Sequence, residues 1–143
     1  MISISDFRAR WIGKRNNFDG GFGPQCVDLV KQWESDNGWQ ITSGNANTYN
    51  GRWLRGYKWV LNNPQDSNQH PNPGDIVSMN AGQFGHVGIC FIANGRTAYI
   101  ISQCFPTPTV VNNKNQVISL GTVTTLTAFN YIHPKIIGWY QKI

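Results

Sequence analysis

One cysteine of this chain stands in a setting that suits nucleophilic catalysis. Cys26 follows a glycine-rich stretch at residues 16–25 (NNFDGGFGPQ), and the apolar residues after it recur at helical spacing, so we place it about two residues into a helix. Unpaired N–H groups and the dipole at a helix N-terminus favour an anion, so this position predicts a thiol of lowered pKa. The alternative is a small buried apolar residue, the commoner fate of a free cysteine.

A histidine later in the chain could serve as the base for this thiol. His86 opens a predicted strand in the segment FGHVGI. Strand alternation puts His86, Gly88 and Cys90 on one face, where the small glycines leave room for a helix carrying a reactive cysteine. A lone strand histidine is more often structural, so the two residues support the hypothesis only together. A cysteine on a helix followed by a histidine on a strand is the order of papain-like enzymes.

The elements that would position this pair are helices in the first half of the chain and strands in the second. We predict an amphipathic helix over residues 3–15 capped by Ser3 or Ser5, a helix from Cys26 to about Asn37, and a short helix with irregular chain over residues 44–61. Pro24 is expected in the first turn of the second helix, and Asn37-Gly38 at its end. The predicted strands are Asp75–Met79, Gly85–Ile92, Thr97–Gln103, Thr109–Val111, Val117–Leu120 and Ile136–Tyr140. Helices before strands indicate an α+β domain, with the helices packed on one face of a mainly antiparallel sheet.

Length, charge and cysteine usage narrow the class of protein. The 143 residues contain no long linker, so we expect one domain over residues 1–143. The net charge of +5 is spread over scattered basic residues, which gives no stripe for a nucleic acid, and none is expected as a partner. Three cysteines without metal-ligand spacing argue against a disulfide scaffold. No stretch approaches the roughly 20 apolar residues of a membrane span, and the first residues lack a signal peptide's apolar core, so we expect synthesis in a cytoplasm and no membrane insertion.

Several motifs together resemble those of a known family. These are FDGGFGPQCVDL, GNA at Gly44–Ala46, PGDIVSM around Gly74-Asp75, and GHVGI around His86. In this order and spacing they resemble CHAP domains, the cysteine- and histidine-dependent amidohydrolases and peptidases, and in particular those of bacteriophage endolysins. The resemblance runs from Phe18 to about Phe105 and implies a papain-like fold. It also implies a phage-encoded, monomeric enzyme that acts on bacterial peptidoglycan.

By this resemblance Cys26 attacks an amide carbonyl of peptidoglycan, and His86 takes the thiol proton and later returns one to the leaving amine. The Cys26 backbone N–H is the expected oxyanion donor, and Gln25 is either a second donor or conformational. Whether the bond lies between muramic acid and the stem peptide or within the peptide stays open. The rival hypothesis is a degenerate wall-binding module that keeps the fold without catalysis.

The chain departs from the family pattern where the histidine is oriented. Similar endolysin domains have Glu-Gln-Asn-Trp after the histidine hairpin, whereas this chain reads Ser102-Gln103-Cys104-Phe105. A two-residue turn at Asn94-Gly95 would set Gln103 opposite His86, and a three-residue loop ending at Gly95 would set Ser102 there. The family register favours Ser102, whose hydroxyl can accept an imidazole N–H bond but cannot stabilise imidazolium as a carboxylate does.

The loop before Cys26 has the oxygen spacing of a calcium site. Asn17, Asp19 and Asp28 stand at offsets 1, 3 and 12, and the carbonyls of Gly21 and Gly23 would fill positions 5 and 7. Some related endolysin domains bind calcium here, which makes Ca²⁺ the one cofactor considered; no organic cofactor is expected. The alternative is an ordinary glycine-rich turn in which Asp19 caps the backbone.

Three aromatic residues could line a groove for the glycan or stem peptide. They are Trp53, Tyr57 and Trp59, whose flat rings suit sugar faces and peptide edges. Core packing is the commoner role for any one of them.

Overall fold

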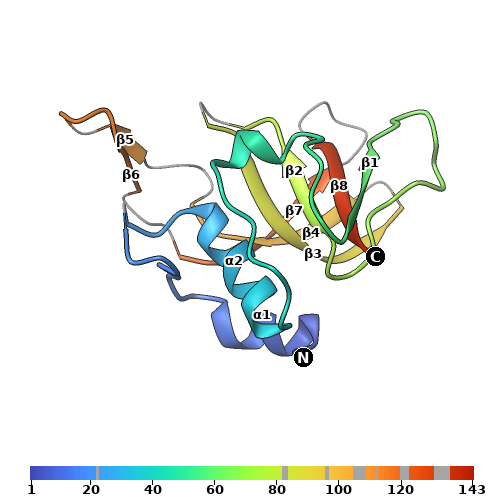
Figure 1. Cartoon of the computed structure of the whole chain (residues 1–143). Helices are drawn as coiled ribbons and strands as arrows, with labels where there is room; N and C mark the ends of the chain where they lie inside the picture. Colours follow the sequence, from blue (N-terminus) through green and yellow to red (C-terminus); the bar gives the residue numbers. More distant parts are fainter. Residues whose placement is uncertain are drawn as a thin grey trace.

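The computed structural model shows two helices against one face of a six-stranded antiparallel sheet (Figure 1). It describes residues 1–21, 23–81, 84–95, 97–104, 109–111, 113–119, 123–130 and 136–143. The helices are α1 (Ile4–Trp11), α2 (Cys26–Asp36) and the 3₁₀ turn η1 (Ala46–Tyr49). The strands are β1 (Tyr57–Leu61), β2 (Ile76–Met79), β3 (His86–Asn94), β4 (Thr97–Ser102), β5 (Thr109–Val111), β6 (Val117–Ser119), β7 (Thr125–Asn130) and β8 (Ile136–Lys142). The sheet order is β1-β8-β2-β3-β4-β7, with β5 and β6 in a separate pair, so the α+β prediction is confirmed.

Local signals in the sequence set the ends of both helices. The Ser3 hydroxyl caps α1 by accepting the Asp6 N–H at 3.1 Å. Helix α2 ends as predicted at Asn37, where Gly38 takes a φ of 71° and the Trp39 N–H returns to the Glu34 carbonyl. Among the described residues, no helix is long and apolar enough to cross a membrane.

The two strands missing from the prediction, β1 and β7, are the two edges of the sheet. Each edge strand is only partly buried, and β1 carries the exposed Lys58 and Leu61. A strand that is only partly buried lacks the clean alternation of a strand with one buried and one exposed face, which explains why both were missed.

The sheet separates two apolar clusters. Between the helices and the sheet lie Leu29, Val30, Trp33, Ile76, Val87, Ile89 and Ile101. On the other face lie Val77, Met79, Cys90, Ile100, Phe129 and Trp139. The central strands are thus buried on both sides, which fixes their register, and with it the place of His86 at the start of β3.

Candidate active site

Cys26 is the first residue of α2 and is only 9% exposed. Gln25 is the N-cap, so Pro24 precedes the cap rather than lying in the first turn as predicted. The Asp28 carboxylate accepts the Gln25 N–H at 2.9 Å, and the Asp28 N–H donates to the Gln25 carbonyl at 3.0 Å. This reciprocal pair fixes the helix start and therefore the direction of the Cys26 backbone N–H.

The start of α2 meets the start of β3. The Val87 N–H lies close enough to the Cys26 thiol to lower its pKa, and Val87 directly follows His86. His86 is fully buried and pairs with Met79 of β2. The structure therefore places the start of α2 beside the residue that follows His86, although Cys26 and His86 are 60 residues apart in the chain.

The expected use of the neighbouring glycines is wrong. Helix α2 packs against the face of β3 that carries Val87 and Ile89. The space at Gly88 is filled from β4, since a Cβ there would lie 2.8 Å from the Ile101 carbonyl oxygen and 3.0 Å from the Ser102 Cβ. Gly85, at a φ of 73°, lies against the Asn47 backbone of η1. Both glycines thus serve close packing around His86.

Burial dominates the electrostatics of the pair. It raises the pKa of the Cys26 thiol to about 12, against the lowering effect of the Val87, Val27 and Cys26 backbone N–H groups. Burial also lowers the pKa of His86 to about 4. The predicted lowering of the thiol pKa is therefore not found, and at neutral pH both side chains are uncharged in this arrangement.

The register of the β3–β4 hairpin differs from both predicted registers, which set either Gln103 or Ser102 opposite His86. Its last pair is Asn94 with Thr97, and a bulge at Phe91 then shifts the ladder so that Ile89 pairs with Ile101. Continued by one residue, this ladder sets Ser102 opposite Gly88, not opposite His86. Both predicted registers failed at the turn, because they paired Ala93 or Ile92 with Arg96, whereas Ala93 pairs with Ala98 and Ile92 with Tyr99. The bulge then shifts the register by one further residue. The buried Ser102 hydroxyl has no hydrogen-bond partner among the described residues, so the expected bond to His86 is not formed.

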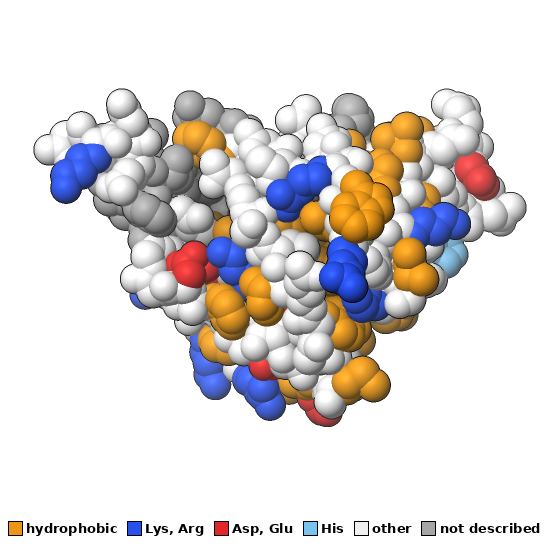
Figure 2. Space-filling view, viewed as in Figure 1, with side chains coloured by type: hydrophobic (Ala, Val, Ile, Leu, Met, Phe, Trp, Pro, Cys, Tyr) orange, Lys and Arg blue, Asp and Glu red, His pale blue; other side chains and the backbone are white. Residues whose placement is uncertain are grey.

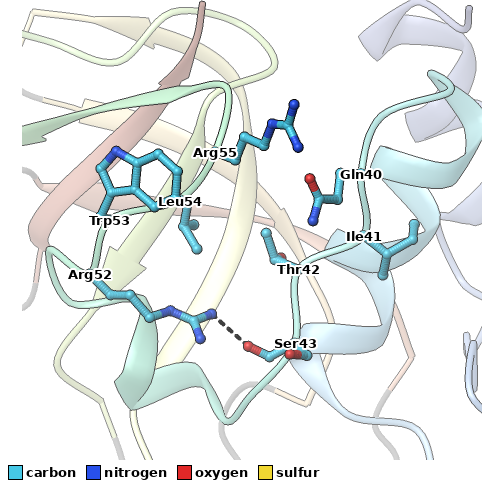
Figure 3. A pocket seen from close by; sticks show the side chains of 8 residues that line it. All are labelled: Gln40, Ile41, Thr42, Ser43, Arg52, Trp53, Leu54 and Arg55. Carbon is cyan, nitrogen blue, oxygen red and sulfur yellow. Dashed lines mark hydrogen bonds between the residues drawn. The ribbon is translucent and has the colours of Figure 1, made fainter.

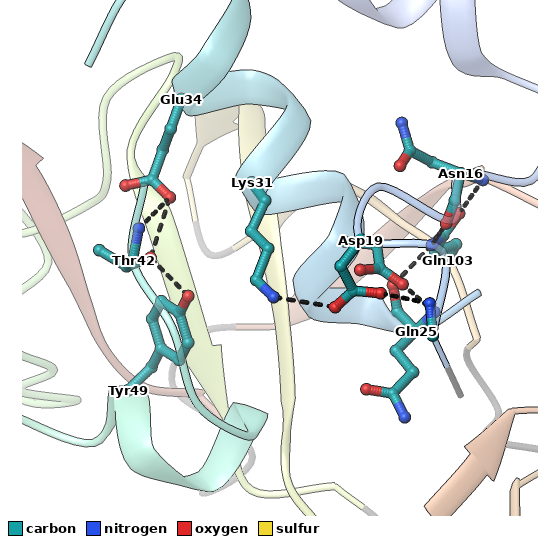
Figure 4. Close-up of polar contacts among 10 residues, drawn as sticks. Asn16, Asp19, Gln25, Lys31, Glu34, Thr42, Tyr49 and Gln103 are labelled. Carbon is teal, nitrogen blue, oxygen red and sulfur yellow. Dashed lines mark hydrogen bonds and ion pairs between the residues drawn. The ribbon is translucent and has the colours of Figure 1, made fainter. Parts of the chain in front are cut away.

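Gln103 holds the loop before the nucleophile against the sheet instead of orienting His86 (Figure 4). Its Oε1 accepts the Asn16 N–H at 2.9 Å, and its Nε2 donates to the Asn16 carbonyl at 2.6 Å and the Gln25 carbonyl at 2.5 Å. Gln103 is fully buried, and the Thr124 hydroxyl also reaches its Oε1. The amide thus joins residues on both sides of the glycine-rich loop. The identical Gln in the family motif was the sequence signal for this residue, but it did not reveal this role.

Cys104 occupies the position that Asn holds in similar endolysin domains. It takes a left-handed φ of 60°, which is unusual for a residue other than glycine or asparagine. Its thiol donates to the Pro24 carbonyl at 2.9 Å, and it lies close enough to Cys26 for a Cys104 thiolate to raise the Cys26 pKa. Cys104 therefore belongs to the wall of the site.

The proposed calcium loop brings two carboxylates near one another. The Asp19 Oδ1 accepts the Gly21 N–H at 3.0 Å, as the ordinary-turn alternative predicts, and the Lys31 Nζ lies 3.2 Å from its Oδ2. Burial, and to a smaller extent the Asp19 charge, raise the pKa of Asp28 to about 6. The Asp28 Oδ1 is buried with no hydrogen-bond partner among the described residues. In the part of the chain that the structure describes, no three His, Cys, Asp or Glu side chains group together as a metal site.

A buried polar network behind the site was not predicted. The Glu34 carboxylate accepts the Thr42 N–H and the Thr42 hydroxyl, and Thr42 in turn bonds to Tyr49 at 2.5 Å (Figure 4). The same carboxylate accepts the Tyr57 hydroxyl at 2.9 Å. Tyr49 lies near Cys26, since a thiolate there would raise the Tyr49 pKa. No local pattern indicates this network, because its members are spread over residues 34–57.

The three predicted groove aromatics separate into two kinds. Tyr57 is buried, and Trp59 packs on Tyr140 with ring centroids 4.7 Å apart. Trp53 is 80% exposed. Only Trp53 is thus available to a ligand at the surface in the way the prediction requires.

A cysteine on the first turn of a helix, set against the strand that begins with a histidine, defines the class of papain-like α+β domains with a cysteine–histidine pair. The model of the CHAP domain family matches residues 15–104, and the chain belongs to this family. None of the curated proteins compared with it matches.

Solved structures share the fold. The wild-type endolysin LysIME-EF1 superposes with a TM-score of 0.74 at 23% identity, over 99% of this chain and 65% of that one. Ly7917 superposes with a TM-score of 0.59 at 13% identity, over 97% of this chain and 60% of that one. This chain thus spans less than two thirds of the length of either protein.

Proposed function

We propose that this chain is a peptidoglycan hydrolase that cleaves an amide bond of the bacterial wall through Cys26 and His86. The observation that carries the proposal is the meeting of the α2 N-terminus, with Cys26 as its first residue, and the start of β3 at His86. Membership of the CHAP family and the fold shared with an endolysin support a wall substrate. By the same likeness we propose a phage-encoded protein that acts as a monomer.

The proposed reaction begins with a neutral thiol and a neutral imidazole. As the Cys26 Sγ bonds to the amide carbonyl carbon, its proton passes to His86, and the carbonyl π pair moves to the oxygen. The Cys26 backbone N–H at the helix start faces the developing oxyanion, with Gln25 as the proposed second donor. The C–N bond then breaks, His86 returns the proton to the amine, and a thioester remains. Water, deprotonated by His86, hydrolyses the thioester and restores the thiol.

The second candidate is a wall-binding module without catalysis. It is favoured by the raised pKa of Cys26 and by the Ser102 hydroxyl, which accepts no hydrogen bond from His86 among the described residues. The two functions differ in one property, which is whether the Cys26 thiol reacts.

Loss of turbidity of purified Gram-positive walls tests the choice. We expect clearing by the wild type and by Cys90→Ala, a control that removes a buried thiol on the other face of the sheet, and none by Cys26→Ala. Mass spectrometry of the released fragments identifies the amide that was cut. Walls that bind both the wild type and Cys26→Ala but are cleared by neither would establish the binding module.

We also propose that the loop before Cys26 binds Ca²⁺. Asn17, Asp19 and Asp28 would supply side-chain oxygens, and Gly21 and Gly23 would supply carbonyls. The supporting observation is the unpartnered Asp28 Oδ1 beside a second carboxylate, with a lysine ammonium as the nearby positive charge. A bound cation would join the loop to the nucleophile helix.

Thermal unfolding with Ca²⁺ and with a chelator tests this site independently of activity. We expect Ca²⁺ to raise Tm for the wild type, to raise it further for Lys31→Gln, whose competing charge is gone, and to leave Asp28→Asn unchanged. Asp66→Asn, in an exposed turn, is the matched control and should respond like the wild type. Equal Ca²⁺ responses in Asp28→Asn and Asp66→Asn would exclude the loop as the site.

A further inference from the structure

An exposed tryptophan stands at a basic pocket on the surface between the end of α2 and β1 (Figure 3). The pocket has a volume of about 210 Å³ and is lined by residues 40–43 on one side and 52–55 on the other. Trp53 is 80% exposed, the largest exposure among the aromatic side chains that the structure describes. A tryptophan so exposed contributes little to the core, so its indole face is free for a ligand.

The charges around Trp53 are positive. Arg52 and Arg55 line the pocket, and Lys142 lies beyond it, with its Nζ against Gly56 and over the Trp39 and Tyr57 rings. On the face shown in Figure 2, Lys and Arg side chains gather near exposed hydrophobic ones. The two ion pairs among the described residues are Arg10–Asp36 and Lys31–Asp19, so neither pocket arginine is paired with a carboxylate there. This surface therefore suits an anion.

The pocket adjoins the catalytic region without being part of it. Gly44 lies against Thr48 and Arg52 on one side of η1, and Asn47 on the same turn lies against Gly85, the neighbour of His86. The Arg52 guanidinium donates to the Ser43 carbonyl at 2.5 Å and lies over the Tyr49 ring, which fixes the rim. One 3₁₀ turn thus separates the pocket from the start of β3. A polymer held at the pocket would keep neighbouring wall material near Cys26.

We propose that Trp53, Arg52 and Arg55 form an accessory site for the phosphodiester-linked, sugar-bearing polymers of the bacterial wall, the teichoic acids. Guanidinium groups match phosphate oxygens, and an indole face packs on sugar rings. Two guanidinium groups lining one pocket fit a chain with repeated charges better than a stem peptide with isolated carboxylates. The inference rests on the proposed wall function, to which it adds a second wall component.

Binding to two wall preparations tests the site. All proteins carry Cys26→Ala so that the walls stay intact, and the walls are used either whole or stripped of phosphodiester polymers with hydrofluoric acid. We expect Trp53→Ala to weaken binding to whole walls roughly tenfold, and Arg55→Gln roughly threefold. Leu61→Ala and Arg10→Gln are the exposed controls, and they should bind like the parent. Arg52 is left intact because it holds Ser43.

The outcomes separate this site from its alternatives. On stripped walls all variants should bind equally weakly, and purified glycosylated poly(glycerol phosphate) should bind the parent but not Trp53→Ala. An equal loss on whole and stripped walls would instead place peptidoglycan itself in the pocket and overturn the proposal. Equal affinity for duplex DNA would reduce the pocket to a general polyanion surface, which also overturns it. Failure of the protein with Cys26 intact to hydrolyse stripped walls would sink the proposed hydrolase function and leave the binding result standing.

Discussion

Replacing Gln103 by leucine should destabilise the protein by about 3 kcal/mol. Leucine keeps most of the volume of this fully buried side chain but removes its three short hydrogen bonds to the backbone of Asn16 and Gln25. The Gln25 carbonyl keeps the Asp28 N–H as a partner. The Asn16 N–H and carbonyl would lose the partners that Gln103 supplies. Each of these two buried unsatisfied groups costs about 1–3 kcal/mol. Folding of the variant no longer requires desolvation of the Gln103 amide, which offsets part of that cost and leaves a net loss of about 3 kcal/mol.

Urea unfolding at pH 7 measures this loss, with Gln69→Leu as the matched control. Gln69 also bonds to backbone at both ends, to the Asn63 N–H and the Leu61 carbonyl, but in a solvent-exposed turn. Water replaces those bonds, so the control should lose less than about 1 kcal/mol. Wall-clearing activity of Gln103→Leu should fall even where the protein is folded, because the loop leading to Cys26 is released. Equal losses in the two variants would refute the assigned role of Gln103.

Three other substitutions test the electrostatics and the hairpin. The pKa of His86 is lower in the folded protein than in the unfolded chain, so the wild type should lose up to about 3 kcal/mol as pH falls from about 6.5 to about 4. His86→Gln should lack this loss, and parallel stability–pH curves would contradict the burial argument. Ser102→Ala removes a buried hydroxyl without a partner among the described residues, so the free energy of unfolding should change by less than about 1 kcal/mol. The variant should still clear purified walls. Abolished clearing would restore Ser102 as a residue that orients His86. Cys104→Asn should raise the free energy of unfolding by about 0.5–1 kcal/mol, since asparagine tolerates a φ of 60° and can still donate to the Pro24 carbonyl. A lower free energy of unfolding in urea would contradict this role of the backbone conformation.

The parts of the fold that were predictable from sequence are those that local chemistry determines. The end of α2 follows from Asn37-Gly38, and the central strands follow from their apolar runs. The edge strands β1 and β7 were missed because they are paired on one side only and are partly exposed. Their places depend on partners distant in the chain, which no local window contains.

The sequence was enough to predict which residues belong to the site, but not how those residues contact one another. Cys26 and His86 could be selected because helix start and strand start are sequence features. The hairpin register depended on the pair at which the turn closes, Asn94 with Thr97, and on the bulge at Phe91, and the role of Gln103 depended on a loop 87 residues away from it in sequence. Both are decided by packing of the whole sheet, which turn chemistry alone does not encode.

Packing around His86 would explain how Cys26 and His86 could act without the orienting Glu carboxylate of related domains, in whose place this chain has Ser102. The imidazole is fully buried, and its strand is enclosed by Asn47 against Gly85 and by β4 against Gly88. A carboxylate would also stabilise imidazolium, which packing cannot do. With the pKa of the thiol near 12 and that of the imidazole near 4, a standing ion pair is unfavourable. The proton must therefore move as Cys26 attacks, when the oxyanion at the helix N-terminus supplies the charge that the site is built to hold.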